Sequence, residues 1–113
     1  SLSLLGVGFH FADKGGTWTW WSGDTVLEQL PRPALSGSYQ LRNAAGVLKA
    51  VSELQARHPV SAATIAEALA TTTLRGRFQR IPGPVEVVLD VAHNAQAVDT
   101  FVATLRTLPA VPR

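Results

Sequence analysis

The chain has 113 residues, 46% of them hydrophobic and 16% charged, with a formal net charge of +2. This composition favours a folded chain over a disordered one. The arginines are scattered rather than clustered, so no nucleic-acid partner is predicted. The absence of cysteine excludes disulfides and thiolate metal sites. No apolar run approaches the roughly 20 residues of a membrane span, so no membrane association is predicted either.

The first third of the chain predicts an antiparallel β meander. Residues 2–11 are apolar and β-prone, and a turn with two glycines follows them. In the next strand Trp18 and Trp20 share one face and Trp21 lies on the other, because side chains alternate along a strand. A third short strand at 25–30 ends at two prolines, which cannot continue regular pairing.

The middle of the chain predicts two helices. The first extends from Asn43 and is broken at Pro59, and Ser61 is a suitable N-cap for the second. Both segments carry an apolar stripe with helical spacing. The stripes comprise Ala44, Val47, Leu48, Val51 and Leu54 in the first helix, and Ile65, Ala66 and Leu69 in the second.

The last third predicts the opening βα unit of a doubly wound sheet, so the fold class is mixed α/β. The Pro82-Gly83-Pro84 run marks a linker or domain boundary. Residues 85–91 are almost continuously apolar, which is typical of a strand buried on both faces of a parallel sheet. A helix follows, with its stripe at Val98, Phe101, Val102, Leu105 and Leu108. Because the chain starts without methionine and stops where a second strand should begin, we expect a piece cut at both ends.

Two polar positions in the middle of the chain could contact a ligand. The amide of Asn43 can donate and accept hydrogen bonds toward an adenine edge or a phosphate, although a helix cap is the simpler interpretation. Arg77 follows Gly76, and its planar guanidinium suits phosphate oxygens while the glycine permits close backbone approach. The alternative is a surface linker with solvated arginines and Phe78 packed inward.

A third polar segment follows the predicted buried strand. Asp90 stands at the carboxyl end of that strand, where open α/β sheets bind ligands, and its carboxylate could accept hydrogen bonds from ribose hydroxyls. His93 and Asn94 precede the last helix, whose free N–H groups favour anions. The alternative assigns Asp90 and Asn94 to backbone capping and leaves His93 as an ordinary loop residue.

Taken in order, these motifs resemble the folylpolyglutamate synthase/dihydrofolate synthase family, which is similar in plan to the Mur ligases. The resemblance covers nearly the whole chain, and the ordered combination is more specific than any one motif. The matching runs are Leu30-Pro31-Arg32-Pro33, Gln40, Asn43-Ala44-Ala45, Gly76-Arg77-Phe78-Gln79 and Asp90-Val91-Ala92-His93-Asn94.

The resemblance implies a two-domain fold and an ATP-dependent ligase reaction. It implies that residues 1–80 end a central ATPase domain and that residues 81–113 begin a Rossmann-like C-terminal domain. In the family, ATP phosphorylates the carboxylate of a folate or dihydropteroate, and the amino group of L-glutamate attacks the resulting acyl phosphate. Whether the acceptor is folate alone or also dihydropteroate is left open. A monomeric enzyme in the cytoplasm, with ATP and Mg²⁺ as cofactors, is implied for the whole protein.

The resemblance also implies roles for individual residues. Asn43, Arg77 and Asp90 match the family's ATP contacts, and His93 matches a position on the glutamate side of the cleft. No catalytic residue or metal ligand is expected among these 113 residues, because they contain no Gly-x-x-x-x-Gly-Lys-Ser/Thr phosphate loop. The magnesium ligands would precede Ser1, so we expect this chain alone to be inactive.

The chain departs from the family pattern at two positions. Many members have proline where this chain has Arg75, and many have proline where it has Ala95. Alanine is a good helix former at the start of a helix, and neither change removes a matched functional group.

Two other functions remain open from the sequence. Another Mur-type amide ligase would share the Asp-x-Ala-His run, although Phe78 and the spacing of Gln40 and Asn43 favour the folate branch. A non-enzymatic α+β binding module could instead use the tryptophan-rich hairpin as its contact surface.

Overall fold

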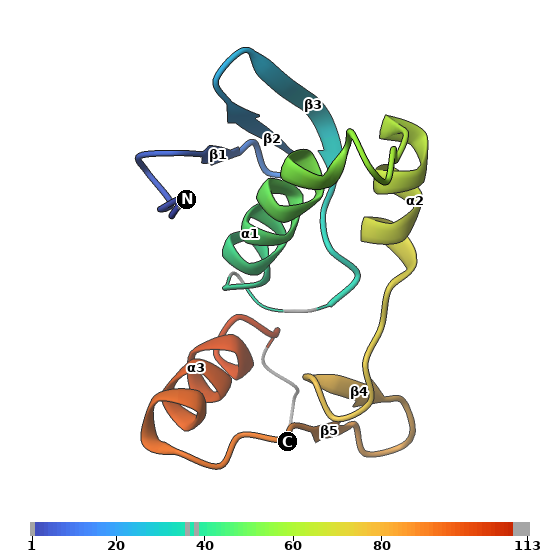
Figure 1. Ribbon diagram of the computed structural model, residues 1–113. Coiled ribbons are helices and arrows are strands. Elements are labelled where there is room, and N and C mark those ends of the chain that lie inside the picture. The colour runs from blue at the N-terminus through green and yellow to red at the C-terminus, as the bar shows by residue number, and fades with distance from the viewer. Residues whose placement is uncertain (1, 36, 38, 110–113) are drawn as a thin grey trace.

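The computed structural model describes residues 2–35, 37 and 39–109, and this part of the chain contains two small sheets and three helices (Figure 1). The mixed α/β class is therefore confirmed. The point at which a second strand of the last unit was expected, after residue 109, lies outside the described residues. In chain order the elements are β1 (His10–Asp13), β2 (Thr17–Ser22), β3 (Thr25–Pro31), α1 (Tyr39–Leu54), α2 (Ala62–Thr71), β4 (Gln79–Ile81), β5 (Val87–Leu89) and α3 (Ala95–Leu105).

The predicted meander is present, but its first strand starts later than expected. Strands β1, β2 and β3 pair antiparallel in that order. Residues 6–8 form a turn instead, between Leu5 and Phe9, which make an isolated β-bridge. The Gly8 N–H donates to the Leu4 carbonyl at 2.8 Å, and Gly6 has a φ of +84°. Apolar composition alone cannot make a strand without a neighbour, and Leu2 is 85% exposed.

Two tryptophans form the centre of the core between the meander and α1. Trp18 and Trp20 have no exposed surface, which confirms that they share one face of β2 and shows that this face is the inner one. The indole N–H of Trp18 donates to the Pro31 carbonyl at 2.8 Å, and that of Trp20 donates to the Ala45 carbonyl on α1 at 3.1 Å. The core comprises Phe9, Trp18, Trp20, Leu30, Leu41, Ala45, Leu48 and Ile65.

The interpretation of the hairpin as a tryptophan contact surface is wrong for two of its three tryptophans. Trp18 and Trp20 are buried, and Trp21 alone of the three lies on the outer face. There its ring stacks on His10, with 5.3 Å between the ring centroids. The aromatic side chains of this hairpin therefore serve mainly to pack the core.

Helix α1 begins four residues before the expected start and is rotated relative to the predicted stripe. Leu41, Ala45 and Leu48 are buried, whereas Val47 is 61% and Leu54 50% exposed. The small side chain of Ala45 allows β2 to approach closely enough for the indole hydrogen bond. Tertiary packing against the tryptophans thus determines which face of the helix is inside.

The second helix begins where the sequence predicts. Ser61 caps α2, and its hydroxyl accepts a hydrogen bond from the Thr64 N–H at 3.1 Å. Its predicted stripe is confirmed at Ile65, which is 8% exposed and belongs to the core. The Leu69 carbonyl accepts from the Ala34 N–H at 2.9 Å, which ties α2 to the segment after β3.

The strand predicted at 85–91 is short, antiparallel and largely exposed, so its expected burial in a parallel sheet is wrong within the described residues. β5 pairs with β4, and Val87 and Leu89 are each 45% exposed. A parallel strand needs neighbouring strands, and β4 is the one that pairs with it here. The Pro82-Gly83-Pro84 run lies in the loop of this hairpin, between β4 and β5, and residues 80 and 81 both belong to β4.

The described chain is elongated. Its radius of gyration is 16.0 Å and its extents are 52 × 29 × 25 Å, against about 13 Å for a compact domain of this length. Figure 1 shows the meander with α1 and α2 at one end and the β4–β5 hairpin with α3 at the other. Within these residues, no helix has the length and apolar character needed to cross a bilayer.

The buried indole of Trp20 predicts an unequal effect of two similar substitutions. Trp20→Phe removes the donor to the Ala45 carbonyl and leaves a void, so it should lower the free energy of unfolding by about 2–3 kcal/mol. Trp21→Phe, on the outer face, should change it by less than about 1 kcal/mol. Urea denaturation of both variants measures the difference, and equal losses would contradict the packing described here.

Candidate functional site

A cleft of about 290 Å³ lies where the start of α1, the turn before β4 and the start of α3 come together. Asn43, Arg77 and Asp90, which the sequence singles out, all line this one cleft. They are separated by 34 and 13 positions in the chain, so the fold is required to bring them together. The remaining lining residues are Tyr39, Asn94, Gln96, Ala97, Thr100 and Phe101.

Arg77 sits in a tight turn rather than in a loose linker. Gly76 has a φ of +71°, and its N–H donates to the Gln79 side-chain oxygen at 3.1 Å. Phe78 is only 3% exposed and packs against Phe101 of α3, with 5.8 Å between the ring centroids. The surface-linker alternative is correct in that Phe78 packs inward, but the exposed Arg77 is presented from an ordered turn at the edge of the cleft.

Both carboxylate oxygens of Asp90 accept backbone hydrogen bonds. Oδ2 accepts from the Phe78 N–H and Oδ1 from the Ala92 N–H, each at 2.8 Å. Part of the backbone-capping interpretation is therefore correct for Asp90. It does not cap α3, because that position belongs to Asn94, whose Oδ1 accepts from the Ala97 N–H at 2.8 Å. An ionised carboxylate has about four acceptor positions, and these two hydrogen bonds leave the others available.

Asn43 is not a helix cap, so that interpretation is wrong. It lies in the second turn of α1, because the helix begins at Tyr39. Its side-chain N–H donates to the Gln40 side-chain oxygen at 3.2 Å. This single contact leaves the amide oxygen of Asn43 and one N–H for a ligand in the cleft.

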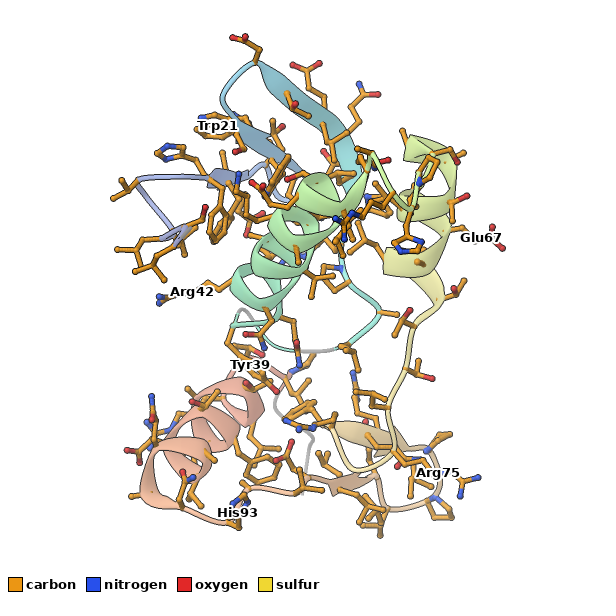
Figure 2. All side chains as sticks on the ribbon, viewed as in Figure 1. Trp21, Tyr39, Arg42, Glu67, Arg75 and His93 are labelled. Atoms are coloured by element: carbon orange, nitrogen blue, oxygen red, sulfur yellow. The ribbon has the colours of Figure 1, made fainter. Side chains whose placement is uncertain are left out.

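His93 is not among the residues that line this cleft. Its ring is exposed, and Nδ1 lies 3.0 Å from the Val91 carbonyl, a geometry that fits donation by a protonated Nδ1. In Figure 2, Tyr39 lies between α1 and α3 in the middle of the picture, whereas His93 lies near the bottom, before α3 begins. The structure brings together three of the four candidate residues and leaves His93 apart from them.

Tyr39 is a lining residue that the sequence analysis missed. It stands four positions before Asn43, so the two side chains lie on the same face of α1. Its ring lies so close to Gly37 that a Cβ at that position would overlap it. The i, i+4 spacing from Asn43 was the signal that could have identified it.

The cleft contains one cation, one carboxylate and several amide or hydroxyl groups. The N-terminal turn of α3 borders it through Asn94, Gln96 and Ala97, and the free N–H groups of such a turn favour anions. Arg77 is a second anion-binding group on the same wall of the cleft. Within the described residues, no three His, Asp or Glu side chains gather as they would to hold a metal ion.

Comparison with known proteins identifies relatives of one kind. No family profile matches the chain. The dihydrofolate synthase/folylpolyglutamate synthase of Escherichia coli (strain K12) is 31% identical over 110 residues, which are 96% of this chain and 24% of that protein. The chain therefore spans about a quarter of the length of the curated relative that it matches.

Solved structures give the same result. The chain superposes on E. coli FolC in complex with ADP with a TM-score of 0.82 and 30% identity, over 96% of this chain and 25% of that one. It also matches a bifunctional folylpolyglutamate synthase/dihydrofolate synthase with Mn, AMPPNP and L-glutamate bound, with a TM-score of 0.75 and 31% identity. That match covers 90% of this chain and 23% of the other. The resemblance inferred from the motifs is thereby confirmed.

The different positions of the two asparagines predict different effects on stability. Asn94→Ala removes the α3 cap and should lower the free energy of unfolding by about 1 kcal/mol. Asn43 lies inside α1 at an exposed position, so Asn43→Ala should change the free energy of unfolding by less than about 0.5 kcal/mol. Denaturant midpoints of the two variants provide the test. A loss at Asn43 as large as that at Asn94 would contradict the assigned helix start.

Proposed function

Because the chain belongs to the folylpolyglutamate synthase/dihydrofolate synthase family over the part of those proteins that it spans, we propose that it forms one side of a nucleotide site in an ATP-dependent ligase. The ligase adds L-glutamate to folates and, in a bifunctional protein, also to dihydropteroate. The family's members are ATP-dependent ligases. The names of the relatives, and the ADP, AMPPNP and L-glutamate in their structures, support this choice of substrates.

One observation carries the proposal: Asn43, Arg77 and Asp90 line a single cleft. Two of them belong to the hairpin and α3 end of the molecule and one to α1. A ligand that contacts all three would join the two ends. A nucleotide has phosphates, hydroxyls and a polar base edge, and the cleft presents a group suited to each.

The residue roles follow from the donors and acceptors that each side chain offers. The Arg77 guanidinium binds phosphate oxygens as a fork of N–H donors, next to the N-terminal turn of α3. The acceptor positions left on Asp90 bind ribose hydroxyls, and the Asn43 amide binds the adenine edge or a phosphate. His93 would face the glutamate side. This role depends on the family match alone, because His93 does not line the cleft.

The proposed reaction has two steps. A carboxylate oxygen of the folate or dihydropteroate attacks the γ-phosphorus of ATP, ADP leaves, and an acyl phosphate forms. The amino group of L-glutamate then attacks the acyl carbon, phosphate leaves, the amine loses a proton, and an amide results. The contribution of this chain is to hold the nucleotide in place, since positioning supplies much of the catalysis in phosphoryl transfer.

The described residues do not fit a magnesium site of their own. Asp90 is the one carboxylate among the residues lining the cleft, and each of its oxygens already accepts a backbone N–H. Mg²⁺ prefers an octahedral set of oxygen ligands. We therefore assign no step to a metal held by these residues.

The domain assignment is also a proposal. We propose that a central ATPase part is followed by a Rossmann-like C-terminal part. The sequence divided them as residues 1–80 and 81–113, but β4 spans that boundary and pairs with β5. The connection that lacks helix or strand, residues 72–78, is the better place for the junction. Location in the cytoplasm and a monomeric state are proposed on the family resemblance.

Titration with MgATP tests the nucleotide site. In a ¹⁵N-labelled sample of this chain, amide shifts should concentrate at the lining residues, among them Tyr39, Asn43 and Asp90. Arg77→Ala should weaken binding by about tenfold or more, since a charge-assisted hydrogen bond contributes about 1.5–3 kcal/mol.

The matched control is Arg75→Ala. Arg75 carries the same charge two positions earlier, is exposed and does not line the cleft. Its removal should leave the affinity for MgATP within about twofold, which is near the effect of an ordinary surface substitution. Equal weakening by both substitutions would indicate unspecific attraction and contradict the site.

The chain by itself should release no phosphate from ATP in the presence of folate and L-glutamate. Its 113 residues contain no phosphate loop to hold the β and γ phosphates, so charge developing in the transition state is not stabilised. A coupled phosphate assay measures this. Release that depends on both substrates and exceeds that of a mock purification would contradict the expectation.

A further inference from the structure

We propose that Asp90 is a positioning residue, whose carboxylate fastens the turn carrying Arg77 to the start of α3 and so fixes the direction of the Arg77 side chain. The proposal rests on the nucleotide site argued above and adds a second role to Asp90. Asp90 then acts on a nucleotide through Arg77 as well as by its own contact.

The first observation is the pair of hydrogen bonds that Asp90 accepts. One comes from Phe78, twelve positions earlier, and the other from Ala92, two positions later. The carboxylate thus joins the turn before β4 to the segment between β5 and α3. A helix cap or a local turn would use neighbouring N–H groups only, so the bond to Phe78 has no local explanation.

The second observation is that the turn has a backbone conformation that needs support. Phe78 has a φ of +46°, in the left-handed region that a large side chain rarely adopts. Its ring is buried against Phe101, so the residue cannot relax without leaving that contact. The N–H that Asp90 holds belongs to this same residue. Strained residues of this kind persist where surrounding contacts over-determine them.

The third observation is a reciprocal contact on the other side of Arg77. The Gly76 carbonyl accepts from the Val91 N–H at 2.7 Å. A Cβ on Gly76 would lie 2.9 Å from a methyl group of Val91, and Gly76 also has a positive φ. Glycine is therefore needed at this position. Arg77 stands between two residues that are each held by the β5–α3 segment.

These contacts make the turn and the start of α3 one rigid piece of the cleft wall. Arg77, Asp90 and Asn94 keep fixed relative positions, whereas Asn43 belongs to the other end of the molecule. Preorganised donors lose less freedom when a charged ligand binds. Loss of the hydrogen bonds to the Asp90 carboxylate would let the turn move. The Arg77 side chain would then no longer point in one fixed direction.

Amide hydrogen exchange tests the fastening without any nucleotide. In the wild-type chain the Phe78 and Ala92 amides should be protected relative to the exposed turn amide of Gly16. Asp90→Asn places an N–H donor where one oxygen accepts, so at least one of the two amides should exchange about tenfold faster. Asp99→Asn makes the same chemical change on an exposed position of α3 outside the cleft and should alter neither amide.

Two exchange results would overturn the proposal. One is unchanged protection of both amides in Asp90→Asn. The other, which does not depend on any variant folding, is exchange at Phe78 and Ala92 in the wild-type chain as fast as at Gly16.

A double-mutant cycle on MgATP affinity tests the action through Arg77. The affinities of the wild-type chain, Asp90→Asn, Arg77→Ala and the double variant are measured by the same titration. Asp90→Asn should lower the MgATP affinity of the wild-type chain more than it lowers that of the Arg77→Ala chain. The two fold-changes should differ by about fivefold or more, because the effects of coupled residues are not additive. A general loss of structure would lower both affinities alike.

The cycle separates this proposal from the nucleotide site itself. Equal losses in both backgrounds would show that Asp90 and Arg77 act independently, and the positioning role would be wrong. If the wild-type chain bound no MgATP at all, the proposal of a nucleotide site would be wrong. The exchange of the Phe78 and Ala92 amides would then decide alone whether Asp90 holds the turn.

Discussion

The docking of two buried indoles onto α1 is the contact on which the rest of the structure depends. Trp18 and Trp20 fill the space between the meander and the helix, and the hydrogen bond from Trp20 to the Ala45 carbonyl fixes the rotation of the helix about its axis. With Leu41, Ala45 and Leu48 inside, Tyr39 and Asn43 necessarily face the cleft. The core therefore selects which residues of α1 are offered to a ligand.

The other wall of the cleft depends on a different kind of contact. The β4–β5 hairpin and α3 share a small apolar contact between Phe78 and Phe101, and backbone hydrogen bonds to Asp90 and Gly76 complete the connection. The elongated shape indicates that few contacts join this end to the core. A ligand that touches both walls would stabilise their mutual arrangement, since binding favours the state that presents the complete site.

The sequence predicted correctly those features that depend only on residues close together in the chain. Side-chain alternation placed Trp18 and Trp20 on one face of their strand, and Ser61 was identified as a cap from its own chemistry. The start of α1 and the pairing of residues 85–91 were predicted wrongly, because both depend on partners distant in the chain. An apolar run has the same composition whether it pairs parallel or antiparallel, and only the presence of β4 beside it decides.

At the candidate site too, the sequence identified the residues, whereas their position relative to one another depends on the fold. The order of motifs selected Asn43, Arg77 and Asp90 without any geometry, and the fold brings them to one cleft. The sequence posed backbone capping and nucleotide binding as alternatives for Asp90, but a carboxylate has more acceptor positions than two backbone N–H groups occupy. The structural bonds orient the carboxylate and leave acceptor capacity for a ligand. Asp90 can therefore hold the fold and also bind a ligand. The backbone hydrogen bonds orient the carboxylate for the ligand.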